Sequence, residues 1–188
     1  MSEEPQKWEE IAVPLTRELN ALNGEFRASI IVLQSYIDYM IDKIIETLIE
    51  SQKLSARRIN FERKIDLLKD LGYIKNETFC DLKALYDIRA ICAHDLDVYS
   101  EMTREKIREK FQQLKIIERG KNEFFPEIDV MQTNLSKLAQ FLLRMLHTRY
   151  TLAFKNKQDK SIKINLDGEY DLNFYRVTAK DIIDSFKK

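Results

Sequence analysis

The chain has 188 residues, of which 44% are hydrophobic and 33% charged, and this composition suits one compact domain with a real core. Its 31 basic and 31 acidic residues balance, so the molecule as a whole has no general attraction for nucleic acid or membranes. Two cysteines and two histidines encode neither a disulfide framework nor a recognisable metal site, and we expect no cofactor. The acidic N-terminal segment lacks an apolar signal core, so we expect a cytoplasmic protein without membrane spans.

A mostly helical fold is indicated by the residues that the sequence favours. Four glycines and three prolines leave little material for the turns of a many-stranded protein, whereas the abundant leucine, lysine, glutamate and arginine favour helix. We therefore expect a helical bundle over residues 1–155 and a small appendage over residues 156–188.

Two helices open the predicted bundle. Over residues 8–23, apolar side chains recur at steps of three and four, and Pro14 is expected to start or kink this helix. The stretch at residues 24–50 carries two apolar stripes. A helix with so much apolar surface is expected to be central.

The next two predicted helices are set by their capping residues. Ser55 is expected to cap a helix that ends at Gly72, where glycine permits a left-handed C-terminal turn. Asn76 or Thr78 then opens the following helix, which contains the stretch "YDIRAICAHDLD".

Two more helices complete the predicted bundle. One runs over residues 103–119 and stops before Gly120, and its inward residues are expected to be Ile107, Phe111 and Leu114. After a linker at residues 121–130, a long helix continues through Phe154 and closes the bundle.

The C-terminal appendage changes from helical to alternating periodicity. Asp167 and Gly168 separate two runs in which apolar and polar residues alternate, which predicts a β-hairpin over residues 162–174, and a short helix capped at Thr178 follows. Because an isolated hairpin is marginal in water, its apolar face is expected to rest on the bundle or on another chain.

Arg89 is the first residue of the fourth helix that suggests function. At about 100° per residue it falls in the middle of an apolar arc with Leu82, Leu85 and Cys92, so it is expected to point toward the core. A buried guanidinium needs partners, so Arg89 either pairs with a carboxylate or opens into a cleft or subunit interface that binds an anion. The carboxylates considered for such an ion pair are Asp38, Asp42, Asp66 and Asp87.

His94 follows five residues later, about 140° around a regular helix, so one helix does not aim both side chains at one point. A distorted helix or a second chain is needed to bring them together. A two-fold dimer is one solution, because it gathers the same side chains from both subunits around its axis.

The stretch "IRAICAHD" resembles the Arg-x4-His motif of the HEPN superfamily, with Arg89 and His94 at its two key positions. The order of helices over about residues 20 to 155 is similar to that of mannitol operon repressor-like members. The resemblance implies an all-helical homodimer, and many members are metal-independent endoribonucleases of toxin–antitoxin or defence systems. In such a site His94 acts as general base or acid, and Arg89 stabilises the charge on phosphorus.

Two functions are compatible with this resemblance. The first is a dimer that binds RNA or a nucleotide and cleaves RNA. The second is a non-catalytic interaction module, such as a regulator or the partner of an antitoxin. Ala90 bears on the choice, because active ribonucleases of the superfamily usually carry a polar residue directly after the arginine.

A basic segment precedes the motif helix and could follow a phosphate backbone. Its members singled out as RNA-binding candidates are Arg57, Arg58, Arg63 and Lys64. The alternative is a solvated helix face that forms surface salt bridges.

Overall fold

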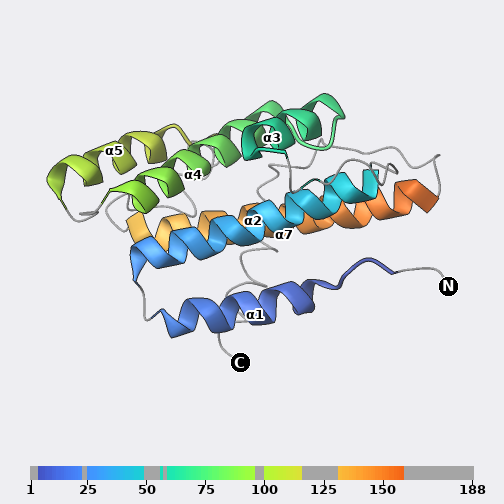
Figure 1. Cartoon of the computed structure of the whole chain (residues 1–188), viewed down its shortest axis with the longest axis horizontal. Helices are drawn as coiled ribbons and strands as arrows, with labels where there is room; N and C mark the ends of the chain where they lie inside the picture. The colour runs from blue at the N-terminus through green and yellow to red at the C-terminus, as the bar shows by residue number, and fades with distance from the viewer. Residues whose placement is uncertain are drawn as a thin grey trace.

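A computed structural model describes residues 4–22, 25–48, 56, 59–95, 100–115 and 131–158. Within these ranges the chain forms the helices α1 (Trp8–Ala21), α2 (Phe26–Leu48), α3 (Phe61–Asp70), α4 (Asn76–His94), α5 (Glu101–Gln112) and α7 (Met131–Gln158), and these residues contain no strand (Figure 1). The expected mostly helical fold is thereby confirmed. The predicted linker at 121–130, the hairpin at 162–174 and the terminal helix lie outside the described residues.

The α2 helix is the centre of the bundle, as its two apolar stripes predict. It packs along α7 and also contacts α1, α3 and α4 (Figure 1). In the view of Figure 1, α1 lies on one side of α2 and α7, and α3, α4 and α5 lie on the other. Its buried apolar residues are Phe26, Ile30, Leu33, Ile37, Met40, Ile41, Ile44 and Ile45. Burial of this much aliphatic surface is the main force that holds the helices together.

Pro14 lies inside α1 and therefore does not start that helix. Ile11 and Leu15 on either side of it are buried in the core. Because proline has no N–H group, the Glu10 carbonyl, four residues earlier, cannot receive its usual helical hydrogen bond. This carbonyl is consequently an acceptor that the helix itself does not satisfy.

The N-terminal end of α1 is fixed to α7 by aromatic and polar contacts. The Trp8 and His147 rings meet edge to face at 5.6 Å, and the Arg144 guanidinium lies 4.6 Å from the Trp8 ring centroid. His147 Nε2 lies 2.8 Å from the Gln6 carbonyl oxygen. Because a carbonyl can only accept, Nε2 carries the proton and donates. His147 is thus a packing residue, as its position on a long helix suggests.

Acidification is expected to weaken the contact between α1 and α7. Burial lowers the pKa of His147, and the nearby Arg144 lowers it further, although the Gln6 carbonyl and Glu9 oppose the shift. The folded protein therefore takes up this proton less readily than the unfolded chain. The stabilisation that neutral His147 provides is complete above the unfolded pKa of about 6.5. It is lost as the pH falls toward the lower pKa of the folded protein.

Urea unfolding at a series of pH values between about 7.5 and 5 would measure this effect, because the range brackets the unfolded pKa. His147→Gln keeps a donor but cannot titrate, so its unfolding free energy should fall less steeply with decreasing pH than that of the wild type. Equal pH slopes for the two proteins would show that His147 is not the responsible group.

The ends of α3 follow from Asn60 and Gly72. Asn60 Oδ1 accepts the Arg63 N–H at 3.0 Å, so this helix begins at Phe61, several residues later than expected from capping by Ser55. Gly72 has a φ of 71°, and the next N–H group, that of Tyr73, donates to the Leu68 carbonyl at 2.8 Å. The predicted left-handed glycine turn is confirmed.

The predicted inward residues are also confirmed, since Ile107 and Phe111 of α5 and Leu114 just after it are all buried. The helix ends at Gln112, earlier than the predicted residue 119, and Ser100 caps its start by accepting the N–H of Thr103. In the described part of the chain, no helix is long and apolar enough to cross a membrane.

Candidate functional site

Arg89 lies on the flank of α4, beside the side that faces the core. The buried residues of α4 are Thr78, Asp81, Leu82, Ala84, Leu85, Ile88 and Cys92. Arg89 follows the fully buried Ile88 but is itself only partly buried, like Tyr86 one turn before it. The expectation that Arg89 points into the core is therefore wrong. The centre of the buried arc is rotated away from it, because the arc also includes Ala84, Ile88 and polar Asp81, whose carboxylate accepts the N–H of Lys115.

The carboxylates considered as partners of Arg89 are mostly engaged elsewhere. Asp38 and Asp42 both bind Lys64, and Asp87 binds Lys110 at 2.8 Å. Among the residues that the structure describes, Arg89 forms no ion pair with any carboxylate. Within the described fold, no carboxylate thus neutralises the positive charge of the Arg89 guanidinium.

His94 is the last residue of α4, and its side chain is exposed. The helix is regular from Asn76 to His94, so a local distortion does not bring Arg89 and His94 together. Side chains five residues apart on such a helix point about 140° away from each other. One copy of α4 therefore presents the arginine and the histidine on different sides.

Two hydrogen bonds hold the end of α4 that carries His94. Arg27 of α2 donates from Nη2 to the Ala93 carbonyl at 3.1 Å. Asp95 accepts from the buried Thr103 hydroxyl at 2.6 Å, which ties the end of α4 to the first turn of α5. The backbone at His94 is consequently fixed while its imidazole stays accessible. Sequence reasoning overlooked Arg27, and the only signal was a single cation near the start of the most apolar helix.

The basic residues of the segment before α4 differ in how far the structure describes them and in how exposed they are. Arg57 and Arg58 lie outside the described residues, and Arg63 is exposed on α3. Lys64, by contrast, is only 3% exposed, with Nζ 2.8 Å from Asp38 Oδ1 and 2.7 Å from Asp42 Oδ1. Lys64 is therefore a structural cation in this fold, which differs from its expected place on an RNA-binding surface.

The charge of Lys64 is maintained by these two carboxylates. Burial alone lowers the pKa of the ammonium group, but the hydrogen bonds and negative charges of Asp38 and Asp42 outweigh burial, so its pKa is raised. The three side chains connect α3 to α2 through a partly buried charged cluster.

Comparison with known proteins gives no match: no family model, curated protein or solved structure is significantly similar to this chain. Among the described residues, no group of three or more His, Cys, Asp or Glu side chains is placed to hold a metal ion. The fold and the site together define an α-helical bundle in which one helix carries a partly exposed arginine and an exposed histidine on different sides.

Proposed function

We propose that the protein is a HEPN-like homodimer that binds RNA through Arg89 and His94 and cleaves it without a metal ion, as toxin–antitoxin or defence ribonucleases do. The observation that carries this proposal is the regularity of α4 through both residues, with His94 exposed and Arg89 partly exposed. A second copy of α4 around a two-fold axis supplies what one copy lacks, which is an arginine directed at the same phosphate as the histidine.

The chemistry of such a site follows from the two side chains. A neutral imidazole accepts the proton of the ribose 2′-hydroxyl as its oxygen attacks phosphorus, and the bond to the 5′ oxygen then breaks as that oxygen receives a proton. The guanidinium stays charged throughout and donates two parallel hydrogen bonds to the phosphate oxygens, on which negative charge accumulates.

A non-catalytic role as an interaction module, regulator or antitoxin partner is the second candidate. Two observations favour it. Ala90 provides no polar group next to Arg89, and Lys64, one of the four cations expected to bind RNA, is sequestered by carboxylates. In that case the flank of α4 is a contact surface for a protein.

The experiment that separates the two functions uses the purified full chain and labelled single-stranded RNA in the presence of a chelator. Cleavage, together with a dimeric mass by light scattering, is expected. A protein that binds RNA without cutting it supports only the binding part, and a monomer that neither binds nor cleaves RNA contradicts the proposal.

A further inference from the structure

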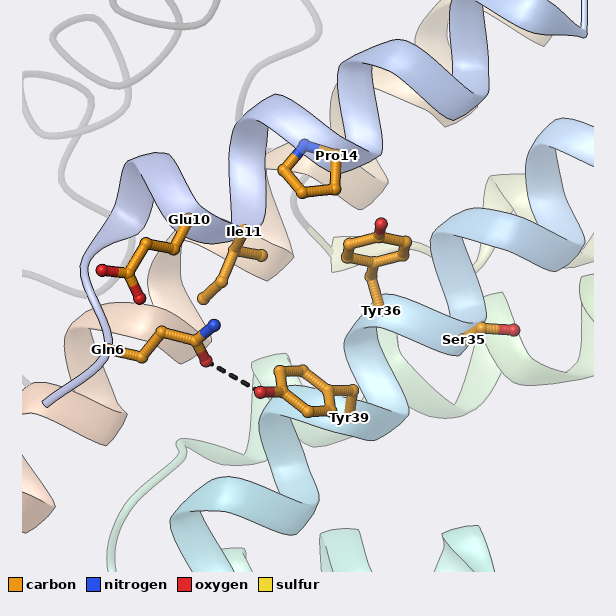
Figure 2. A pocket seen from close by; sticks show the side chains of 7 residues that line it. All are labelled: Gln6, Glu10, Ile11, Pro14, Ser35, Tyr36 and Tyr39. Atoms are coloured by element: carbon orange, nitrogen blue, oxygen red, sulfur yellow. Dashed lines mark hydrogen bonds between the residues drawn. The ribbon is translucent and has the colours of Figure 1, made fainter.

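A pocket of about 340 Å³ lies between α1 and α2, and its walls are mostly aromatic and apolar (Figure 2). Ile11 and Pro14 of α1 face Tyr36 and Tyr39 of α2 across it. In Figure 1, α1 lies on the opposite side of α2 from α4, so this pocket is distinct from the candidate RNA site.

Each tyrosine hydroxyl of the pocket already donates its one hydrogen bond to a neighbouring side chain. Tyr36 donates to Glu18 Oε1 at 3.0 Å. Tyr39 donates to Gln6 Oε1 at 2.8 Å, the bond drawn in Figure 2. Burial, followed by the hydrogen bond and charge of Glu18, raises the pKa of Tyr36 to about 12, so this hydroxyl stays protonated. What each hydroxyl still offers to a ligand is an oxygen lone pair.

The α1 side of the pocket adds more acceptors and negative charge. Pro14 and Glu10 both line it, and the Glu10 carbonyl is the one that Pro14 cannot satisfy within the helix. The Glu10 side chain extends away from the two tyrosines in Figure 2, so its carboxylate acts on the pocket as a nearby negative charge rather than as a direct ligand. The bound group should therefore be a hydrogen-bond donor with positive charge.

The aromatic wall suits a cation as well. The face of a tyrosine ring attracts positive charge through its quadrupole. Tyr39 already does so in this structure, because the Lys43 ammonium lies 5.6 Å from its ring centroid. The apolar surfaces of Ile11 and Pro14 would hold an alkyl chain attached to the cation.

We propose that the pocket between α1 and α2 binds an alkylguanidinium or alkylammonium group, provided by a free amine or by an arginine or lysine side chain of a partner. Tyr36, Tyr39 and the Glu10 carbonyl accept its hydrogen bonds, and Glu10 and Glu18 balance its charge. This site is independent of RNA binding at α4.

Titration of the intact protein with butylguanidinium, butylammonium and the neutral butylurea tests the proposal. Trp8 is the only tryptophan of the chain and lies two residues from Gln6 of the pocket, so its fluorescence reports binding. We expect saturable changes with the two cations and none with butylurea. An acetylated arginine peptide distinguishes the two sources: tighter binding of the peptide indicates a protein partner, and tighter binding of the free cation indicates a small amine.

Variants localise the effect to the pocket. Tyr39→Leu and Glu10→Gln should each weaken binding of butylguanidinium about two- to fivefold. Glu9→Gln is the matched control, since it removes the same charge one residue away from an exposed side chain that does not line the pocket. The proposal is overturned if no cation binds, if butylurea binds equally well, or if Glu9→Gln has the same effect as Glu10→Gln.

Discussion

RNA cleavage is expected to fall about 100- to 10,000-fold when His94 is replaced by alanine, because the substitution removes the group that moves protons at the ribose and the leaving oxygen. Arg89→Ala should cost about 100-fold or more, since it removes the positive charge that faces the phosphorus in the transition state. Initial rates on labelled single-stranded RNA, with a chelator present, measure both effects.

Two controls show whether these losses are specific to the site. His147→Gln changes the other histidine of the chain, which contacts Gln6 and Trp8 at the start of α1. This substitution should leave cleavage unchanged. Arg108→Ala removes an exposed arginine of α5 that pairs only with its helix neighbour Glu105 in the described structure. Cleavage that persists in both the Arg89 and His94 variants would exclude α4 as the active site.

A mixture of the two inactive variants tests the dimer directly. If each working site takes its arginine and its histidine from different copies of α4, a mixed dimer of Arg89→Ala and His94→Ala retains one site with both residues. Refolding the variants together should then restore cleavage that neither shows alone. Each variant folded alone should stay inactive, because neither of its sites then has both residues. If mixed dimers are shown to form and still do not cleave RNA, the shared-site arrangement is contradicted.

The arrangement of helices could be predicted well because hydrophobic periodicity depends on local spacing. The main apolar stripe of α2, from Phe26 to Ile44, is buried as expected, whereas Tyr36 and Tyr39 of its second stripe are partly exposed or exposed. Gly72 ends α3 as its freedom of backbone conformation indicates. Helix ends were less predictable. Ser55 and Asn60 are both good caps, and only the fold shows that Asn60 is used.

The orientation of Arg89 could be predicted only in part, because apolar Ile88 can be read from the sequence as part of the buried arc but polar Asp81 cannot. A wheel drawn from apolar residues leaves out Asp81, which is fully buried because a backbone N–H from Lys115, 34 residues away, satisfies it. Including Asp81 and Ile88 rotates the buried arc and moves Arg89 to its edge. A polar residue can be recognised as part of a core only when its distant partner is known.

Lys64 illustrates the same limit for charge. In the sequence it is one of several cations and suggests a phosphate-binding surface, whereas in the fold it lies against two aspartates of α2, 22 and 26 residues earlier. The sequence does contain a hint, because Asp38 and Asp42 are four residues apart on a central apolar helix and repel each other without a shared cation.

Replacing Lys64 by methionine is expected to lower the free energy of unfolding by about 2–4 kcal/mol. Methionine preserves most of the side-chain volume, so the loss comes from the two carboxylates rather than from a cavity. Asp42 is 14% exposed and would remain charged in a poorly hydrated position, while Asp38, at 43% exposed, is partly screened by water. Equilibrium unfolding in urea at neutral pH measures the change.

Lys83→Met is the matched control, because Lys83 forms an ion pair with Glu62 in which both side chains are about half exposed. The same substitution there should change the unfolding free energy by no more than about 0.5 kcal/mol. Adding Asp42→Asn to Lys64→Met should recover part of the lost stability, since it removes the less hydrated of the two unpaired charges. Equal effects at positions 64 and 83 would mean that the cluster between α2 and α3 contributes no more than a surface pair.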